Sequence, residues 1–276
     1  MRIKELLCKR LKELGIDRLY VDSLKRKYAK SYMQTLAVKM LIENLTIKAE
    51  RIMGNKIGEE CGIELYGRGE ETEVNYKIDK GEPLIYPPQT PFFLIDFNLW
   101  DMMTDEERKS TTLQFILTLN VIRNYLWDGN LGVLNAPTEF FQLFEKFQKG
   151  LKYSFLALNK MEIKGDNPIV LNPYGNIIAD EEILRNSDTI ILGGIVDKGR
   201  RIREATTELS RISGYYDLPQ VKITLRGSII GVPDRLNSIV EIVLKVKEGY
   251  TLEDAIISSQ SKADKLRRLY YEMTRG

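Results

Sequence analysis

The sequence predicts an α/β protein: a mainly parallel sheet with helices on both faces, preceded by a smaller α+β N-terminal domain. Two observations lead to this class. From residue 92 onward, short apolar runs alternate with amphipathic helical patterns, which is typical of parallel strands joined by helices. Before that point, helical spacing gives way to a strand-like pattern, which indicates a separate unit containing both kinds of structure.

Helical spacing dominates roughly the first 54 residues, which we expect to be helical. Residues 6–16 (LLCKRLKELGI) place apolar side chains at helical intervals, and Gly15 is a typical stop. Residues 31–53 predict a second, longer amphipathic helix that ends near Gly54. Residues 62–78 (GIELYGRGEETEVNYKI) then predict two short strands joined by a polar, glycine-rich turn.

The proline-rich segment YPPQTP, residues 86–91, is stiff and predicts a domain boundary. We therefore expect three parts. They are a basic α+β domain at residues 1–88, an α/β domain at 89–248 and a helical tail at 249–276.

The α/β part is divided by clear start and stop signals. Thr104 and the acidic residues after it suit a helix N-terminus, and Gly150 and Gly214 suit helix ends. The predicted strands are residues 92–97, 131–136, 167–171 and 189–194, with short extended pieces at 215–219 and 221–225. The predicted helices are residues 104–125, 137–150, 180–186, 199–214 and 235–249, followed by the tail from Tyr250.

Three loops that follow predicted strands carry residues suited to binding. They are LNPYGN (171–176), GGIVDKG (193–199) and residues 226–234. In parallel α/β sheets, ligands bind outside the carboxyl ends of the strands. We therefore expect a pocket near all three loops if their strands are neighbours.

Composition excludes several kinds of chemistry. The chain of 276 residues has no histidine, which excludes a Ser-His-Asp triad and the commonest general base. Cys8 and Cys61 lie far apart without paired spacing, so we expect two reduced thiols in a cytosolic protein and no metal site. The charged N-terminus and the lack of a long apolar run predict neither a signal peptide nor a membrane segment.

Charge is unevenly distributed. Residues 1–57 hold 14 Lys and Arg against 6 Asp and Glu, a balance of +8, and because the net charge is +2 the remainder carries −6. A basic segment on an acidic body suggests a polyanionic partner. The alternative is a solvated, lysine-rich helical surface, and charge alone does not separate the two.

The run GGIVDKGRR, from residue 193, combines two glycines at a strand end with an aspartate and a basic cluster, so it is a candidate binding motif. It lacks the spacing of a dinucleotide fingerprint and of a phosphate-binding loop. From physics alone, Asp197 is expected to cap the following helix, and the basic residues after it are expected to form a solvated face. Paired glycines at a strand end also allow a ligand or another chain segment to approach closely.

A family resemblance changes this interpretation. TIILGGIVDKGRR (residues 189–201) resembles the signature of the SPOUT-class tRNA methyltransferases that methylate N1 of the purine at position 9. The similarity covers roughly residues 92–258 in family order. Further matching segments are residues 92–125 with Asp96 and Asp101, DLP at 217–219, and 236–256. The loop at residues 226–237 departs from the family's Arg-Lys-Val-Leu-x-Val-Asn form.

The resemblance implies a SPOUT methyltransferase domain at residues 89–248, a C-terminal trefoil knot and S-adenosylmethionine as cofactor. The implied cofactor-binding residues are Leu192, Gly193, Gly194, Lys198, Leu218, Ile230 and Val232. The alternative for Leu218, Ile230 and Val232 is core packing. The implied catalytic residues are Asp197, as a base for guanine or an electrostatic partner for adenine, and Asp101. Asp96 is a further candidate, with helix capping or solvation as the alternative for both Asp96 and Asp101.

The resemblance also implies tRNA as substrate, gripped through its phosphates and with base 9 exposed for reaction. The implied RNA-binding residues are Lys25, Arg26, Lys27, Lys30, Arg200, Arg201 and Arg203. Adenine is the favoured base because the short chain resembles the archaeal branch, with guanine or both purines as alternatives. We expect a monomeric cytoplasmic enzyme without a metal. A non-catalytic RNA-binding protein on the same scaffold and a small-molecule α/β enzyme are the rival classes.

Overall fold

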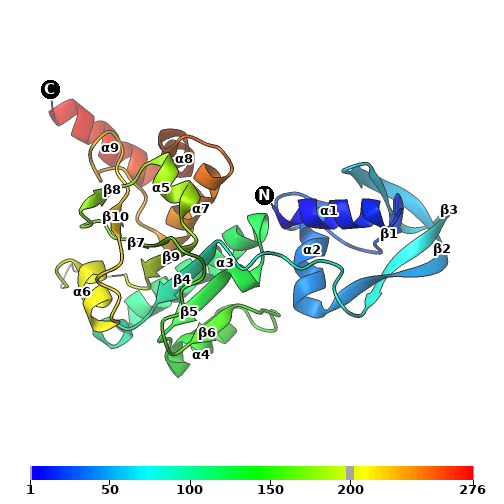
Figure 1. Cartoon of the computed structure of the whole chain (residues 1–276), viewed down its shortest axis with the longest axis horizontal. Helices are drawn as coiled ribbons and strands as arrows, with labels where there is room; N and C mark the ends of the chain where they lie inside the picture. Colours follow the sequence, from blue (N-terminus) through cyan, green and yellow to red (C-terminus); the bar gives the residue numbers. More distant parts are fainter. Residues whose placement is uncertain (1, 197–201, 276) are drawn as a thin grey trace. The chain divides into compact units, whose positions relative to one another are not determined.

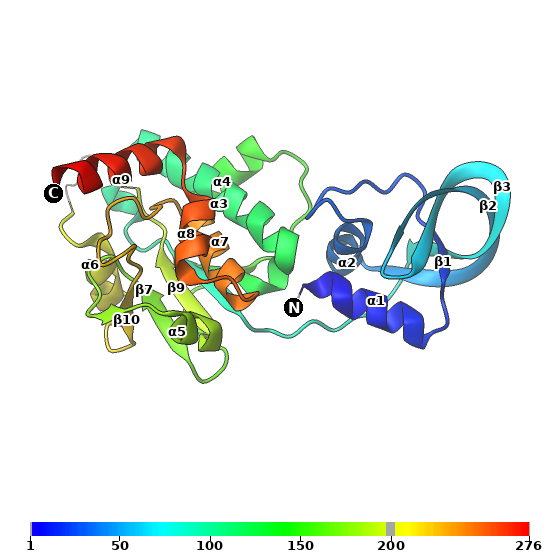
Figure 2. The same ribbon diagram turned by 90° about the horizontal axis from the view of Figure 1, so that it is seen from above.

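The structure is a computed structural model that describes residues 2–196 and 202–275. Within these ranges the chain forms two compact units (Figures 1 and 2). The first unit is the chain up to Pro88 together with Arg123–Asp128 and Lys152–Ser154, and the second comprises the rest. The sequence predictions for Asp197, Lys198, Arg200 and Arg201 lie outside the described residues.

The first unit combines two helices with a mixed sheet. Helices α1 (Ile3–Glu13) and α2 (Tyr32–Glu43) pack together through buried apolar side chains such as Leu7, Leu11 and Leu36. In the part of this unit that the structure describes, three strands form a sheet in the order β1-β3-β2. Their bounds are β1 Arg18–Tyr20, β2 Leu45–Glu60 and β3 Ile63–Lys80. The predicted α+β character of the N-terminal part is confirmed.

The predicted helix at residues 31–53 is wrong in its second half. The helix ends at Glu43, because Asn44 adopts a left-handed conformation (φ 54°) and caps it, a role that asparagine tolerates well. The chain then continues as the long strand β2. Pairing with β3, beginning at Leu45 opposite Lys80, overrides the helical spacing of the sequence.

The predicted pair of short strands at residues 62–78 is a single strand. β3 runs antiparallel to β2, and Figure 2 shows the two as a strongly curved ribbon. The turn lies at Cys61 and Gly62, and both adopt positive φ. Gly54 does not end a helix: a Cβ there would lie 2.6 Å from the carbonyl oxygen of Gly67, so the glycine allows a close backbone approach inside the ribbon.

The expectation of two reduced thiols is also wrong. Cys8 on α1 and Cys61 at the β2–β3 turn form a disulfide with a Cα–Cα distance of 6.2 Å. The two residues are separated by 53 positions, so no local spacing indicated the pair. The tertiary fold brings the helix and the turn together.

The second unit contains the predicted parallel sheet, which is confirmed. Within the described residues its seven strands are all paired in parallel, in the order β6-β5-β4-β9-β7-β10-β8. The strand bounds are β4 Phe92–Asp96, β5 Leu131–Leu134, β6 Leu156–Leu158, β7 Pro168–Leu171, β8 Ile177–Ile178, β9 Thr189–Gly193 and β10 Gln220–Lys222. The short edge strands β6 and β8, like β1 in the first unit, were missed by the sequence patterns.

The remaining helices follow the predicted alternation. They are the one-turn segments Trp100–Met102 and Asp128–Asn130, then α3 Asp105–Tyr125, α4 Thr138–Phe147, α5 Glu181–Asn186, α6 Ala205–Ile212, α7 Leu236–Lys247, α8 Leu252–Ser259 and α9 Lys262–Thr274. Helix α6 begins later than predicted, since Glu204 before it has a left-handed conformation (φ 50°). Helix α7 packs against α5 and α8, and α6 packs against β9. The trefoil knot stays a prediction.

Two apolar clusters stabilise the second unit. One lies on the sheet and includes Phe92, Leu94 and Ile191, each almost completely buried. The other is aromatic: Phe97 lies 4.5 Å from Phe140, measured between ring centroids. Burial of such side chains contributes roughly 1.5–3 kcal/mol each. The carboxyl ends of β4 and β9 therefore pack against tightly buried side chains.

Candidate functional site

A cavity of about 890 Å³ lies at the carboxyl ends of neighbouring strands in the second unit. Strands β9, β7 and β10 are adjacent in the sheet, so the loops that follow them meet at one edge. The lining residues come from the ends of β7, β9 and β10, from the loop after β10, and from helices α6, α7 and α9. They are Leu171–Pro173, Leu192, Gly193, Ile195, Thr206, Val221, Ile223, Ile229–Asp234, Leu236, Ile239, Leu266, Arg267, Tyr270, Tyr271 and Thr274. Its size and mainly apolar wall are those of a small-molecule site.

The structure brings some of the predicted cofactor residues to this cavity. Leu192, Gly193, Ile230 and Val232 line it. Leu218 packs against the apolar cluster on the sheet and does not line the cavity. Lys198 lies outside the described residues.

The two glycines at the end of β9 have different surroundings. A Cβ on Gly193 would lie 3.2 Å from Cδ2 of Leu209, the end of a flexible side chain. A Cβ on Gly194 would lie 2.7 Å from the buried ring of Phe97 and 3.0 Å from the backbone oxygen of Asp96. The amide of Gly194 also donates a hydrogen bond of 2.8 Å to that same oxygen. Gly194 is therefore required for backbone packing at the base of the site.

We expect Gly194→Ala to lower the free energy of unfolding by about 1–3 kcal/mol, the usual effect of overpacking a core. Phe97 cannot yield because Phe140 and Trp100 pack against it. Gly193→Ala is the matched control and should cost less, since Leu209 can change rotamer. Urea unfolding of both variants tests this, and equal losses would contradict the packing argument.

A buried carboxylate organises the same strand end. Asp96 is fully buried at the end of β4. It accepts hydrogen bonds from the hydroxyl of Tyr215 (2.8 Å), the amide of Asn98 (3.0 Å) and the side chain of Asn135 (3.2 Å). Burial raises the pKa of Asp96, and the hydrogen bonds oppose that shift. Burial also raises the pKa of Tyr215, which therefore remains the donor. Asp96 holds three loops together instead of facing the cavity.

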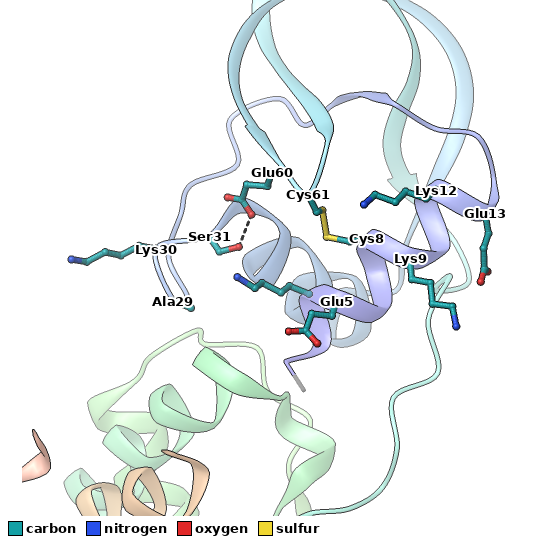
Figure 3. Close-up of a pocket in the computed structure, with 11 residues that line it drawn as sticks. Glu5, Cys8, Lys9, Lys12, Glu13, Ala29, Lys30, Ser31, Glu60 and Cys61 are labelled. Carbon is teal, nitrogen blue, oxygen red and sulfur yellow. Dashed lines mark hydrogen bonds between the residues drawn. A yellow bond between two sulfur atoms is a disulfide. The ribbon is translucent and has the colours of Figure 1, made fainter. Parts of the chain in front are cut away.

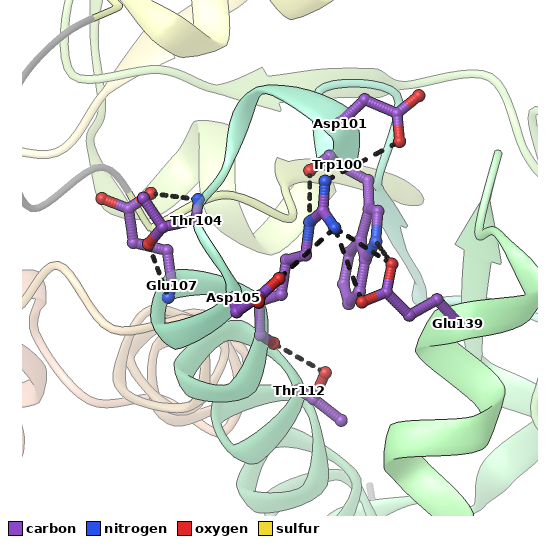
Figure 4. A network of polar contacts seen from close by, with 8 residues as sticks. Trp100, Asp101, Thr104, Asp105, Glu107, Thr112 and Glu139 are labelled. Atoms are coloured by element: carbon purple, nitrogen blue, oxygen red, sulfur yellow. Dashed lines mark hydrogen bonds and ion pairs between the residues drawn. The ribbon is translucent and has the colours of Figure 1, made fainter.

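Asp101, predicted as catalytic, occupies a different place. Its side chain is fully exposed and lies 3.9 Å from a guanidinium nitrogen of Arg108. Figure 4 shows the surrounding network, in which Arg108 donates to Glu139 (3.1 Å) and to the carbonyl of Trp100 (3.1 Å). Asp101 does not line the cavity, and its fully exposed carboxylate makes a long ion-pair contact with Arg108 at the edge of this network.

The predicted RNA-binding residues fall in both units. Lys25, Arg26, Lys27 and Lys30 are exposed on the first unit, where the Arg26 guanidinium lies 5.5 Å from the ring centre of Tyr32. Lys30 lines a hollow of about 770 Å³ together with Lys4, Lys9 and Lys12 of α1 (Figure 3). The Cys8–Cys61 disulfide lies in the wall of this hollow. Arg203 is exposed in the turn before α6 of the second unit.

Two contributors to the cavity were not among the predicted site residues, although the first lies in the loop 171–176 that the sequence predicted near the pocket. One is Asn172, a buried residue whose amide donates to Thr207 (2.9 Å) and Gln220 (3.1 Å), which fixes the end of β7. The other is helix α9, whose cavity-lining residues Leu266, Tyr270 and Thr274 recur every four positions on one face. That spacing was visible in the sequence, but nothing local indicated where the face packs.

Across residues 2–196 and 202–275, no group of three or more His, Cys, Asp or Glu side chains could hold a metal ion. Over those residues there is also no helix with the length and apolarity needed to span a membrane. A parallel sheet with a large cavity at its carboxyl edge defines an α/β protein of the cofactor-binding class.

Comparison with known proteins identifies the family. Residues 1–79 match the family model described as the tRNA (adenine(9)-N1)-methyltransferase N-terminal domain. A tRNA (adenine(9)-N1)-methyltransferase of Sulfolobus acidocaldarius is 41% identical over 99% of this chain and 89% of its own length. The chain therefore belongs to the tRNA (adenine(9)-N1)-methyltransferase family, and the resemblance to the SPOUT-class enzymes is confirmed.

One further relative and one solved structure extend the comparison. A tRNA (guanine(9)-/adenine(9)-N1)-methyltransferase of Thermococcus kodakarensis is 27% identical over 95% of this chain and 74% of its own length. The crystal structure of Sulfolobus acidocaldarius Trm10 in complex with S-adenosylhomocysteine matches with a TM-score of 0.78 and 36% identity, covering 99% of this chain and 89% of that one.

Proposed function

We propose that this protein transfers the methyl group of S-adenosylmethionine to N1 of the purine at position 9 of tRNA, with adenine as the favoured base. The observation that carries the proposal is the cavity at the carboxyl ends of β7, β9 and β10, in a chain whose full-length relative is an adenine-9 methyltransferase. The dual-specificity relative supports guanine as a second substrate.

The cavity residues suit this cofactor. An adenosyl group has apolar faces, for which the side chains of Leu192, Ile223 and Val232 provide an apolar wall. Asp234 and Arg267, which also line the cavity, offer opposite charges for an amino and a carboxylate group. The bound cofactor supplies a methyl group already activated on a sulfonium. The protein's task is to position that group and the acceptor nitrogen in line.

The choice of base determines the role of an acidic residue. N1 of adenine has a free lone pair and needs no base, but the product is a cation that a carboxylate stabilises. N1 of guanine carries a proton that a base must remove. We assign this role to Asp197, which follows the β9 strand end in the sequence. Asp101 is the second candidate.

Asp197→Asn should lower kcat about tenfold or more on a transcript with adenine 9, because an electrostatic partner is lost. The loss should be larger, of the order of 10²–10⁴, on a transcript with guanine 9, where a general base is removed. Steady-state kinetics at saturating cofactor test this. Full activity on both transcripts would contradict the assignment, and Asp101→Asn run in parallel tests the second candidate.

We assign binding of the tRNA backbone to basic residues. They are chiefly the exposed Lys25, Arg26, Lys27 and Lys30 of the first unit. Arg200, Arg201 and Arg203, nearer the cofactor loops in sequence, are assigned the same role. The acceptor base must leave the tRNA core before reaction, so the protein needs a grip that is independent of that base. We further propose that the enzyme acts as a monomer in the cytoplasm.

Replacing Lys25, Arg26 and Lys27 by alanine should weaken tRNA binding and make it less sensitive to salt. Each lost phosphate contact should reduce the slope of log affinity against log salt by about 1. Affinity for S-adenosylhomocysteine should not change. A variant with the same three residues interchanged between lysine and arginine keeps the charge and serves as the control. Equal tRNA affinity of the alanine variant and the wild type would contradict this assignment.

The decisive experiment for the proposed function uses labelled S-adenosylmethionine and two unmodified tRNA transcripts, one with adenine and one with guanine at position 9. We expect label in N1-methyladenosine. Label in both N1-methyladenosine and N1-methylguanosine would establish dual specificity, and label in N1-methylguanosine alone would contradict the preference for adenine. Absence of label from both transcripts would refute the proposed reaction.

A further inference from the structure

Helix α9 forms one wall of the cavity, and only its Arg267 has a part in the proposed function so far. Five of its side chains line the cavity: Leu266, Arg267, Tyr270, Tyr271 and Thr274. The loop Leu225–Asp234 packs against this helix, and its residues Ile229–Asp234 also line the cavity; it lies largely within the segment 226–237 that departs from the family pattern. Contacts that fix the conformation of this loop therefore also fix the shape of the cavity.

Arg268, also on α9, contacts the backbone of the loop Leu225–Asp234 through its guanidinium. The residue is only 8% exposed. Its Nη1 donates hydrogen bonds to two backbone carbonyls of the loop, that of Leu225 at 2.8 Å and that of Ile230 at 3.2 Å. A hydrogen bond from a charged donor is stronger than one between neutral groups. The side chain thus ties the two ends of the segment 225–230 together.

The loop and the helix also fit each other closely. Gly231 has a positive φ of 85°, and a Cβ there would lie 2.6 Å from Cβ of Arg268. The side chain of Gln260, just before α9, donates to the carbonyl of Gly231 at 2.8 Å. On the other side, Arg268 forms an ion pair with Glu272, and its guanidinium lies 5.3 Å from the ring centre of Tyr271. Arg268 is thereby held on both sides.

We propose that Arg268 is a positioning residue for cofactor binding, which holds the loop Leu225–Gly231 in the conformation that forms the cavity wall. The inference rests on the proposed function for the identity of the cofactor. Ile230 and Gly231 line the cavity directly, so a loop that drifts from α9 loses part of the wall. When only a fraction of molecules holds the loop in place, the apparent dissociation constant rises by the inverse of that fraction.

The main variants are Arg268→Ala, Arg268→Lys and, as a control on the same helix, Lys265→Ala. Lys265 is exposed and does not line the cavity. Calorimetric titration of the full-length protein with S-adenosylhomocysteine should show about tenfold weaker binding for Arg268→Ala, the effect of losing a charged hydrogen bond. Arg268→Lys should lie between Arg268→Ala and the wild type, because an ammonium keeps the charge but not the guanidinium geometry. Lys265→Ala should bind as the wild type does.

Two further measurements separate positioning from a purely structural role. In hydrogen exchange without cofactor, the amides of residues 225–231 should exchange faster in Arg268→Ala, and those of β4 and β9 should not. In methyl transfer, KM for S-adenosylmethionine should rise, with kcat at saturation and KM for tRNA unchanged.

Unchanged S-adenosylhomocysteine affinity in Arg268→Ala overturns the proposal, as does faster exchange spread over the whole second unit. If Arg268→Ala does not fold, Arg268→Lys decides, and wild-type affinity in that variant overturns the proposal. Failure of the wild-type protein to bind S-adenosylhomocysteine would instead refute the proposed function.

Discussion

Asp128→Asn should lower the free energy of unfolding of the first unit by about 3–5 kcal/mol, the usual cost of breaking a buried ion pair. Asp128 is fully buried and forms an ion pair of 2.7 Å with Arg123, whose side chain is 2% exposed. It also accepts a hydrogen bond of 2.8 Å from the amide of Ser154. Arg123 in turn donates to the hydroxyl of Tyr28 (3.0 Å) and to the carbonyl of Lys152 (3.0 Å).

The cost arises because asparagine keeps the shape of aspartate but leaves the Arg123 guanidinium as an uncompensated charge away from water. The same pair joins segments that are far apart in sequence, since residues 123–128 and 152–154 belong to the compact unit formed by the first 88 residues. Losing the pair should therefore weaken the packing of residues 123–128 and 152–154 against the first 88 residues, and not only the contacts of one side chain.

Asp22→Asn is the matched control for this change. Asp22 forms an ion pair of 3.2 Å with Arg68, and both side chains are more than half exposed. Exposed pairs of this kind contribute about 0–1 kcal/mol, and asparagine suits the positive φ of 51° at this position. Urea unfolding followed by circular dichroism measures both variants. Similar small losses for both would contradict the interpretation of Asp128 as a buried structural charge.

Removing the Cys8–Cys61 disulfide should have an effect of comparable size. The bridge closes a loop between residues 53 positions apart, for which the loss of chain entropy on cross-linking corresponds to about 4 kcal/mol. It ties α1 to the β2–β3 turn, in the wall of the hollow that Lys4, Lys9, Lys12 and Lys30 also line. We expect the double variant Cys8→Ala with Cys61→Ala to unfold at a clearly lower temperature than the oxidised protein.

Reduction provides the control for the disulfide. Dithiothreitol should lower the unfolding temperature of the wild-type protein towards that of the double variant, and should leave the double variant unchanged. Thiol alkylation and mass spectrometry report how many cysteines are free in the unreduced protein. Two free thiols, or a wild-type unfolding temperature that does not respond to reductant, would show that the bridge does not stabilise this unit.

Local sequence patterns predicted most of the second unit because its helices and strands are short and are bounded by clear capping residues and glycines. Phe92–Asp96 and Thr189–Gly193 are continuous apolar runs, and a run of that length bounded by helical patterns has few alternatives to a buried parallel strand. The positions of the functional loops follow from the same logic, since loops after parallel strands share one edge of the sheet. The absence of histidine restricts the acid–base chemistry whatever the fold, because composition does not depend on how the chain folds.

In the first unit, local sequence patterns were not sufficient to predict the secondary structure or the disulfide. Residues 45–53 have both helical and strand-compatible spacing, and pairing with β3 decided between the two. The disulfide depends on how α1 meets the β2–β3 turn, which no spacing in the sequence encodes.

By itself the sequence determined the class of fold, the family motif after β9 and the absence of histidine chemistry. Only the tertiary structure decided what each residue faces. It placed Asp96 in the interior beside Tyr215, Asp101 on the surface, and Arg268 of α9 under the cavity loop. The physical reason is the sequence separation over which each effect acts: helical or strand periodicity and turn preferences depend on residues close together in the sequence. Burial, close backbone approach and ion pairing depend on segments that meet only after the chain has folded.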